Sequence, residues 1–352
     1  MLTDKKVVVT GGTGSLGKVL VRRLLSGELG MPKSIVVFSR DEAKQHAMRL
    51  AYQRRRAATD EVIYRNFEQV LQFQIGDVRD YHSVSAVMRN ADIVFNAAAL
   101  KQVPSCEYFP FEAVQTNIIG PQNIVQAIRE NTLAVEAVVG VSTDKACEPV
   151  SVMGMTKAIH ERILVQANMD YPATRFMCVR YGNVLASRGS VIPLFHEQIR
   201  SGGPVTITTP EMTRFLISLD EAVDTIFAAL RGAKRGETYI PRAPSARITE
   251  VVDVLIGDRP IKTRVIGIRP GEKIHEILVS EEESHRATER GGYYVIKPML
   301  PELRTVTKDE VNLEAEYSSA DGVITRAELE ELLRKHRLML EDRTDFEEEL
   351  LA

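Results

Sequence analysis

The chain has 352 residues, a formal net charge of −3 at pH 7 and 44% hydrophobic residues. That length allows one large domain or two unequal ones, and the small net charge favours neither a nucleic acid nor a membrane as partner. Three scattered cysteines without CxxC spacing are typical of a reducing compartment. No apolar run approaches roughly twenty residues, and a strand pattern already begins at Val7. We therefore expect a soluble cytoplasmic protein without a membrane span or signal peptide.

The first half of the chain alternates short apolar runs with amphipathic stretches. The apolar runs predict buried strands at Val7–Val9, Ile35–Phe38, Phe73–Ile75, Ile93–Phe95, Val138–Val141 and Met177–Val179. The stretches between them predict helices at Leu16–Leu25, Asp41–Arg56, Ser83–Met88 and Ala113–Arg129. This alternation predicts an α/β fold with a Rossmann-like doubly wound parallel sheet, whose ligands bind at the carboxyl ends of the strands.

After about Tyr181 the pattern loosens into segments punctuated by glycine and proline. We expect an NADP-binding Rossmann domain over residues 1–180, with a returning segment at about 215–235 that holds the helix Leu219–Leu230. Residues 181–352 should form mainly a smaller, interleaved C-terminal substrate domain, with a charged helix from Thr325 to Arg337. Tyr317–Glu328 resembles half of a calcium-binding loop, but tyrosine stands at its first ligand position and no second loop follows, so no metal site is expected.

A glycine-rich turn separates the first predicted strand from the first predicted helix. Gly11 allows the tight turn, Gly14 lets the backbone approach a pyrophosphate, and Gly17 permits close packing of helix on strand. The helix N-terminus adds amide donors and partial positive charge. The other predicted members of this cradle are Thr13, Ser15 and Leu16. The position of the turn, between strand and helix, predicts dinucleotide binding.

The residues after the second predicted strand bear on which dinucleotide binds. Ser39 can donate to a phosphate, Arg40 can hold it as a fork, and Lys44 follows one turn onward. Asp41 could instead take the ribose hydroxyls of NAD, although an aspartate there also suits a helix N-cap. These residues favour NADP and leave NAD possible. Later strand ends should place Asp77 and Val78 at the adenine, and Ala97, Ala98 and Ala99 against the ribose and nicotinamide.

The apolar run Val138–Val141 leads directly into a proton-transfer cluster of Ser142, Thr143, Asp144 and Lys145, and Lys157 follows at helix spacing. Oxidoreductases of this kind usually carry a tyrosine four residues before such a lysine. Here that position holds Met153, which has no proton to exchange. The alternative interpretation of the cluster is a helix cap after a strand, because Ser, Thr and Asp favour such positions.

Further strings occur in the same order as in a known family. They are Ala99–Glu107, Arg180–Val184 with Ser187–Pro193, Met212–Phe215 and Arg269–Lys273. With these strings the chain resembles the extended short-chain dehydrogenase/reductase superfamily. Within that superfamily it is most similar to the soluble UDP-N-acetylglucosamine 4,6-dehydratase group of bacterial surface-polysaccharide synthesis. Some members of that group also carry methionine in place of the tyrosine, so Met153 departs from the superfamily but not from this branch.

The resemblance implies an NADP-dependent lyase that makes a UDP-4-keto-6-deoxy sugar by internal hydride transfer. Hydride leaves sugar C4, the C5 proton and the C6 hydroxyl are lost as water forms, and hydride returns to C6. The reaction needs bases at the C4 hydroxyl and at C5, and an acid at C6. We expect Lys145, with its pKa lowered by Lys157 and the nicotinamide, to take the C5 proton. Asp144 is expected to take the C4 hydroxyl proton and pass it to C6, with Thr143 as a relay and Lys157 on the ribose.

The resemblance also implies a nucleotide-sugar substrate and a homo-oligomer. The predicted substrate contacts are Lys101, Asn183, Arg188, Arg214 and Arg269, since arginine forks suit a diphosphate. Two other functions stay open. A nucleotide-sugar 4-epimerase would use the same scaffold but normally needs the missing tyrosine. A non-catalytic NADP-binding sensor would explain the lost tyrosine, but it would have no use for an ordered set of proton-transfer residues.

Overall fold

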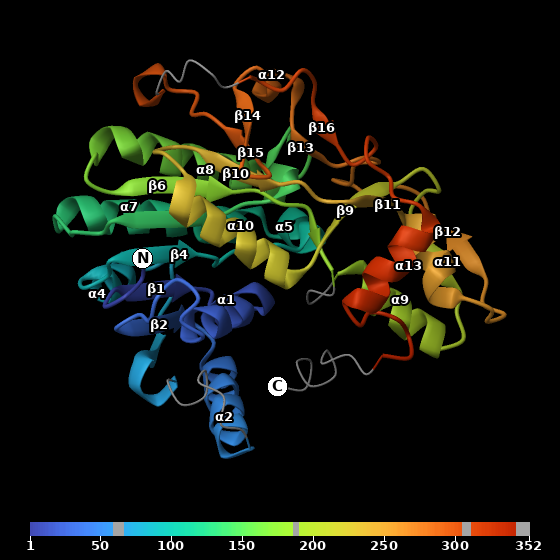
Figure 1. Ribbon diagram of the computed structural model, residues 1–352, viewed down its shortest axis with the longest axis horizontal. Helices are drawn as coiled ribbons and strands as arrows, with labels where there is room; N and C mark the ends of the chain where they lie inside the picture. The colour runs from blue at the N-terminus through green and yellow to red at the C-terminus, as the bar shows by residue number, and fades with distance from the viewer. Residues whose placement is uncertain (59–66, 186–189, 305–310, 343–352) are drawn as a thin grey trace.

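A long, twisted sheet forms the centre of the larger lobe in the computed structural model, which describes residues 1–58, 67–185, 190–304 and 311–342 (Figure 1). In this described part the sheet has nine strands. Their spatial order is β14 (Ala287–Arg290), β15 (Tyr293–Ile296), β10 (Thr238–Pro241), β6 (Arg175–Val179), β5 (Ala137–Val141), β4 (Ile93–Asn96), β1 (Lys6–Thr10), β2 (Ser34–Ser39) and β3 (Leu71–Ile75). All six strands expected from the apolar runs are present.

The strand order confirms the doubly wound sheet. β3, β2, β1, β4, β5, β6 and β10 run parallel, and the order reverses between β1 and β4, where Thr10 pairs with Asn96. Such a reversal opens a crevice at the carboxyl ends of the strands. At the far edge, β15 and β14 join antiparallel. These two strands come from late in the chain. The second half of the chain therefore contributes strands to the sheet, in addition to the returning helix that was expected.

Helices cover both faces of the sheet because successive side chains of each buried strand point to opposite sides. On β5, Val139 packs into the core on one face and Val138 into the core on the other. The first face is covered by α1 (Ser15–Leu25), α2 (Glu42–Ala58) and α10 (Leu219–Gly232), and the second by α4 (Tyr81–Met88), α7 (Gly120–Glu130) and α8 (Val152–Asp170). The returning helix α10 begins at a capping box between Ser218 and Glu221.

The helix expected over Ala113–Arg129 is divided. It consists of α6 (Pro110–Val114), the π-helical turn η1 (Gln115–Ile119) and α7. The turn buries Asn117, whose amide accepts from the Leu100 N–H at 2.8 Å and donates to the Leu100 carbonyl at 2.9 Å. A π-turn that redirects one polar side chain is common beside functional sites. Here it holds the loop that leads from β4 into α5 (Val103–Tyr108).

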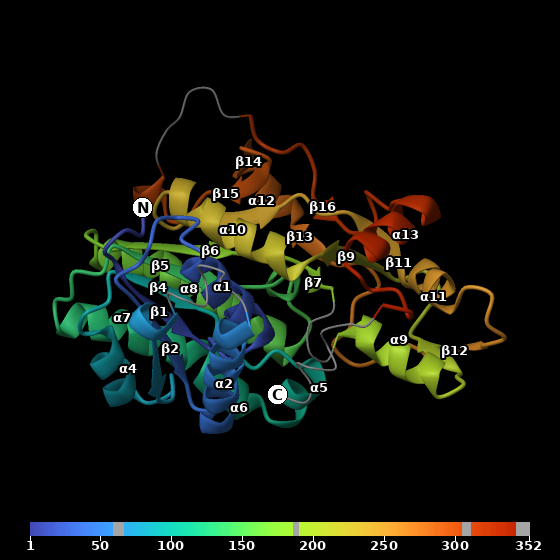
Figure 2. The same cartoon turned by 60° about the horizontal axis from the view of Figure 1, so that its bottom comes forward.

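A smaller lobe lies beside the carboxyl ends of the strands, and both views show its helices grouped together (Figures 1 and 2). Its apolar core includes Phe195, Val252 and Leu333. Its elements are β7 (Asn183–Val184), α9 (Val191–Arg200), β8 (Val205–Ile207), β9 (Thr213–Ile217), β11 (Ser245–Arg247), α11 (Ile248–Ile256), β12 (Thr263–Val265) and the predicted terminal helix α13 (Arg326–Lys335). The remaining short elements are η2 (Asp144–Ala146), β13 (Ile277–Val279), α12 (Glu281–Ser284), η3 (Pro301–Leu303) and β16 (Tyr317–Ser318).

Replacing Gly17 by alanine should lower the melting temperature. A Cβ at this position would lie 2.5 Å from the Gly11 carbonyl oxygen and 2.5 Å from Gly12 Cα, so the backbone of the turn would have to move. Overpacking of this kind costs about 1–3 kcal/mol of unfolding free energy. Gly322→Ala is the matched control, because a Cβ there meets nothing within 4 Å. Equal melting temperatures for the two variants would contradict the close packing inferred here.

Candidate active site

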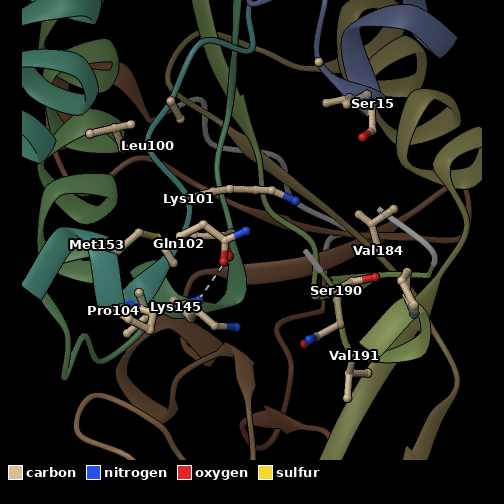
Figure 3. A pocket seen from close by; sticks show the side chains of 18 of the residues that line it. Ser15, Leu100, Lys101, Gln102, Pro104, Lys145, Met153, Val184, Ser190 and Val191 are labelled. Atoms are coloured by element: carbon tan, nitrogen blue, oxygen red, sulfur yellow. Dashed lines mark hydrogen bonds between the residues drawn. The ribbon is translucent and has the colours of Figure 1, made fainter. Parts of the chain in front are cut away.

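A cleft of about 1260 Å³ lies between the carboxyl ends of the parallel strands and the smaller lobe. Its walls come from both lobes, and Figure 3 shows Lys101, Lys145 and Met153 on one side and Ser190 and Val191 on the other. The strand-order reversal thus produces a cavity large enough for a dinucleotide and a second ligand. Most residues predicted for cofactor and substrate line this cleft.

The glycine turn has the geometry of a phosphate cradle. Gly11 has φ +67°, and a Cβ on it would lie 2.8 Å from Ala98 Cα, so only glycine fits. Gly14 precedes α1, and beyond its chain neighbours a Cβ there would meet only the Gly11 carbonyl oxygen, at 3.3 Å, among the described residues. A ligand can therefore approach the backbone at Gly14 beside the helix N-terminus. The cradle residues Thr13, Ser15, Leu16 and Gly17 line the cleft, as do Ala97, Ala98, Ala99, Asp77 and Val78.

After the end of β2, the acidic residue that could have bound the ribose hydroxyls is engaged in contacts with its own helix. Asp41 caps α2 by accepting from the Lys44 N–H at 3.0 Å, and its carboxylate pairs with Lys44 Nζ at 2.5 Å. Ser39 shares a hydrogen bond of 3.0 Å with the Thr13 hydroxyl, which ties the strand end to the cradle. Arg40 is 54% exposed and lies 3.9 Å from the Asp77 carboxylate. Ser39, Arg40 and Lys44 of this corner all line the cleft.

The proton-transfer cluster lies where β5 ends. Thr143 caps the short helix η2 and donates its hydroxyl hydrogen to Asp144 Oδ1 at 2.8 Å. Lys145 Nζ donates to the same Oδ1 at 3.1 Å. Asp144 is fully buried, and its Oδ2 has no hydrogen-bond partner among the described residues. The predicted group of hydroxyl, carboxylate and amine is therefore assembled at the cleft, with one carboxylate oxygen unoccupied by other contacts.

The sequence analysis missed a second carboxylate in this cluster. Glu276 Oε1 lies 3.1 Å from Lys145 Nζ and 3.7 Å from Arg214 Nε, and the residue is 1% exposed. Glu276 stands just before β13, and the string Arg269–Lys273 that supported the family resemblance ends three residues earlier. Proximity to that string was the available signal, but nothing in the local pattern pairs this glutamate with Lys145.

The two carboxylates have opposite pKa shifts. Burial raises the pKa of Asp144, and the nearby charge of Glu276 adds to the shift. Burial also opposes the charge of Glu276, but Lys145 and Arg214 outweigh it and lower the pKa of that carboxyl. Burial opposes the charge of Lys145 too, yet Asp144 and Glu276 together raise its pKa. The prediction that Lys145 has a lowered pKa is therefore wrong, because it considered the cations around Lys145 and not the second carboxylate.

Lys157 has the depressed pKa that had been expected of Lys145. Its Nζ donates to the Val141 carbonyl at 2.5 Å and lies 2.7 Å from His160 Nδ1. Burial lowers the pKa of Lys157 to about 8. One turn earlier on α8, Met153 is buried against Cys106 and Ala113 and borders the cleft. The tyrosine position thus holds an apolar side chain at the cleft wall.

Four of the five predicted substrate residues border the cleft, namely Lys101, Asn183, Arg214 and Arg269. Arg188 lies outside the described residues. Desolvation by the cleft walls lowers the pKa of Lys101, although the residue as a whole is exposed. Arg214 donates to the carbonyls of Thr213, Lys273 and Ile274 at 2.7–3.0 Å, so most of its donors hold backbone. Its role at a diphosphate stays a prediction, as do the roles of the other three.

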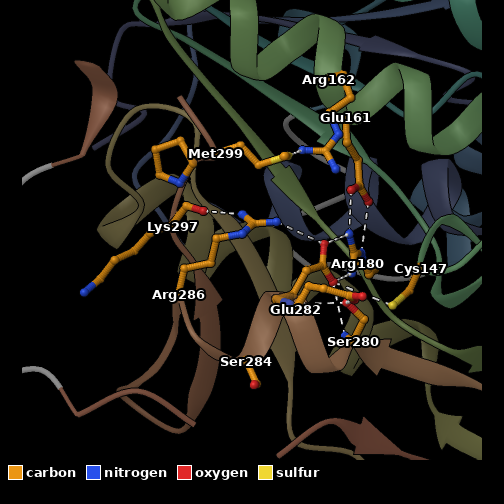
Figure 4. Close-up of polar contacts among 12 residues, drawn as sticks. Cys147, Glu161, Arg162, Arg180, Ser280, Glu282, Ser284, Arg286, Lys297 and Met299 are labelled. Atoms are coloured by element: carbon orange, nitrogen blue, oxygen red, sulfur yellow. Dashed lines mark hydrogen bonds and ion pairs between the residues drawn. The ribbon is translucent and has the colours of Figure 1, made fainter. Parts of the chain in front are cut away.

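A buried ion network supports the cluster from behind (Figure 4). Arg180 is 2% exposed and donates to both oxygens of Glu161, to both oxygens of Glu283 and to the Leu278 carbonyl at 2.6–3.1 Å. Ser142, next to the proton-transfer cluster, donates to Glu161 at 2.5 Å. A buried guanidinium with all its donors used fixes several elements at once. Here it joins the end of β6 to α8, β13 and α12.

Neither a metal cluster nor a membrane-crossing helix is found in the described ranges. No group of three or more His, Cys, Asp or Glu side chains there could hold a metal ion. No helix in the same part of the chain is long and apolar enough to cross a membrane.

Comparisons with known proteins agree with the fold. A family described as "Polysaccharide biosynthesis protein" matches residues 7–298. The chain is 43% identical over 302 residues to a UDP-glucose 4-epimerase of Rickettsia akari, with 84% of each chain covered. The solved structure of Pen from Bacillus thuringiensis is 35% identical with a TM-score of 0.85, covering 96% of this chain and 100% of that one. DesIV, a dTDP-glucose 4,6-dehydratase of Streptomyces venezuelae with NAD and TYD bound, shares the fold at 21% identity and a TM-score of 0.64, over 76% and 86% of the two chains.

Removing the charge of Glu283 should change how stability depends on pH. Arg180 overcomes the burial of this carboxyl and lowers its pKa from 4.5 to about 2. A depressed carboxyl pKa contributes stability that is present above the unfolded value and is lost as the pH falls towards the folded value. The difference corresponds to about 3 kcal/mol at pH 7. Wild type should therefore lose more unfolding free energy between pH 5 and pH 3 than Glu283→Gln does.

Chemical denaturation at each pH measures this effect. Glu302→Gln, at an exposed position, is the matched control and should behave like wild type. An identical pH dependence for Glu283→Gln and wild type would show that the ion network does not hold Glu283 as a carboxylate. Arg180→Met is the harsher variant, since it strands two buried carboxylates and should cost about 3–5 kcal/mol.

Proposed function

The chain belongs to the polysaccharide biosynthesis protein family, and we propose that it is a nucleotide-sugar 4,6-dehydratase that converts UDP-N-acetylglucosamine to a UDP-4-keto-6-deoxy sugar. It is an extended short-chain dehydrogenase/reductase of the type that includes nucleotide-sugar dehydratases and epimerases. One observation carries the choice of dehydration. The cleft contains an acid and a base in contact, Asp144 and Lys145, while Met153 occupies the position of the usual single acid–base tyrosine.

The cofactor we propose is NADP. The glycine cradle fits a dinucleotide, Asp41 is engaged as a helix cap, and Ser39, Arg40 and Lys44 line the cleft where a ribose phosphate would need cations and donors. A bound NADP would supply the hydride acceptor for sugar C4 and the hydride donor for C6. NAD, which DesIV binds, is the alternative.

The contact between Lys145 and Asp144 supplies both groups that the elimination step needs. A proton that moves from Lys145 Nζ to Asp144 across 3.1 Å converts an ammonium and a carboxylate into an amine and a carboxylic acid. The amine can then take the C5 proton while the acid gives its proton to the departing C6 hydroxyl, which leaves as water. This restores the original ion pair. The ammonium returns the proton to C5 when C6 is reduced.

The proton of the C4 hydroxyl then needs a separate acceptor. Asp144 was expected to take it, but a protonated Asp144 beside a cationic Lys145 would leave no base for C5. Lys157 is the better candidate because its pKa of about 8 leaves part of the lysine neutral near physiological pH. Lys157 lines the cleft one turn beyond Met153. In this proposal Lys157 accepts the C4 hydroxyl proton that the tyrosine would otherwise accept. Its proton finally replaces the one that Lys145 returned to C5.

The name of the Rickettsia relative favours a second candidate, a nucleotide-sugar 4-epimerase. An epimerase removes hydride from C4 and returns it to the other face, without loss of water. It needs no acid at C6, so the paired Asp144 and Lys145 would have no catalytic role.

A non-catalytic NADP-binding sensor transfers no protons, so Lys157 would have no catalytic role in it either. The expected homo-oligomer and cytoplasmic location stay predictions.

The protein should convert UDP-N-acetylglucosamine to a 4-keto-6-deoxy product when it is incubated with NADP⁺ in deuterated water. NMR spectroscopy of the reaction mixture identifies the product and the positions of its deuterium. One deuterium is expected at C5, because that proton exchanges with a lysine amine, and none at C6, because that hydrogen comes from C4. Substrate deuterated at C4 is the matched control and should carry its label to C6. Formation of UDP-N-acetylgalactosamine without loss of water would establish the epimerase instead.

Asp144→Asn should separate oxidation from dehydration. The amide cannot act as the acid at C6, so the reaction should stop after C4 oxidation. In a single turnover, absorbance of the reduced cofactor at about one equivalent is expected, with dehydrated product reduced at least about 100-fold. If no reduced cofactor forms, Asp144 and not Lys157 is the acceptor of the C4 hydroxyl proton. In wild type, the rate of C4 oxidation should rise with pH through about 8, as Lys157 loses its proton.

A further inference from the structure

Glu276 has an unusual setting for a structural ion pair. Its Oε1 lies 3.1 Å from Lys145 Nζ, and its Oε2 is buried without a hydrogen-bond partner in the described part of the chain. The same is true of Asp144 on the other side of Lys145, where Oδ1 is bonded and Oδ2 is not. Unsatisfied buried carboxylate oxygens are costly, and they are found where a ligand or a proton completes them.

The position of Glu276 is fixed by the backbone around it. Its N–H donates to Ser319 Oγ at 2.9 Å, and its carbonyl accepts from the Ser319 N–H at 2.8 Å. Arg214 donates to the carbonyls of Lys273 and Ile274, three and two residues before Glu276. Lys273 Nζ donates to the Cys147 carbonyl at 2.8 Å, which links this segment to the loop of Lys145. These five hydrogen bonds hold the backbone on both sides of the Glu276 side chain, so the placement of its carboxylate beside Lys145 is built into the fold.

From this geometry we propose that Glu276 is a positioning residue for the proposed dehydration: its carboxylate is the counter-charge that keeps one proton shared between Lys145 and Asp144. The inference rests on the proposed function for its chemical meaning. Without Glu276, Lys145 would face one carboxylate and the cation Arg214, and it would release its proton to solvent more readily. The pair would then lack the acid that dehydration requires.

The charges around Lys145 and Glu276 determine in which direction loss of the Glu276 charge would move the pKa values of Lys145 and Asp144. Lys145 faces Asp144 on its own loop, Glu276 before β13 and Arg214 on β9. Glu276 faces Lys145, Arg214 and Lys273, and His275 is turned to the Thr213 hydroxyl at 2.8 Å. The charge of Glu276 raises the pKa of Lys145 and also that of Asp144. Its removal should therefore shift both titrations to lower pH, whereas a purely structural loss would lower activity without moving them.

Glu276→Gln tests the inference without relying on the sugar. The Lys145 side chain is 24% exposed and lines the cleft, so a small acylating reagent can label its amine across a pH series, with the extent of labelling read by peptide mass spectrometry. The apparent titration of Lys145 in Glu276→Gln should move at least about one pH unit lower than in wild type. An unchanged titration in a folded variant would overturn the proposal. Glu281→Gln, an exposed glutamate on the same segment, is the matched control.

Turnover supplies the second readout. With UDP-N-acetylglucosamine, Glu276→Gln should lower kcat about 10- to 100-fold and move the alkaline limb of its pH profile to lower pH, with little change in KM. Glu276→Asp keeps the charge and should keep the limb near its wild-type position. A lower kcat with an unmoved limb would overturn the inference. If wild type leaves the sugar unchanged, the proposed function fails, and the labelling result still decides whether Glu276 holds the proton of Lys145.

Discussion

One cation held between two buried carboxylates is the constraint on which the cleft depends. Lys145 Nζ lies 3.1 Å from Asp144 and 3.1 Å from Glu276, and both carboxylates are almost completely buried. One ammonium cannot fully compensate two carboxylates in a medium of low dielectric constant, and the second cation, Arg214, lies beside Glu276 at 3.7 Å. The cluster therefore separates their proton affinities, with Asp144 shifted towards the acid form and Glu276 towards the carboxylate. Two chemically similar groups acquire different tasks from their surroundings.

The rest of the architecture keeps these three groups together. Asp144 and Lys145 follow a central strand of the sheet, whereas Glu276 enters from the segment that precedes β13. Arg180 joins the same two regions from behind, since it binds Glu161 on α8 and the Leu278 carbonyl on β13. The group around Lys145 and the ion network around Arg180 both contain buried charges. Such burial is tolerated because the cations donate hydrogen bonds to carboxylates and carbonyls. The ionic contacts thus fix the distance between groups that the chain carries far apart.

The missing tyrosine fits this arrangement. Met153 packs against Cys106 and Ala113, where a phenol would have needed a partner at the cleft wall. Lys157 remains on the same helix with its pKa lowered to about 8, and the acid–base pair lies on the neighbouring loop. An enzyme that only moves hydride at C4 needs one proton acceptor. Dehydration also needs an acid at C6 and a base at C5, and a cleft with two carboxylates and two lysines contains enough groups for those steps.

Local patterns in the sequence determined strands β1 to β6, the glycine turn and the adjacency of Asp144 to Lys145, because each depends on residues close together in the chain. They also placed Lys157 and Met153 one turn apart on a helix. The tertiary structure alone decided that β14 and β15 join the sheet, that Arg214 holds backbone, and that Glu276 faces Lys145. It also reversed the predicted direction of the Lys145 pKa. Electrostatic energy depends on distance in space and on burial, and neither quantity can be obtained from the spacing of residues along a chain.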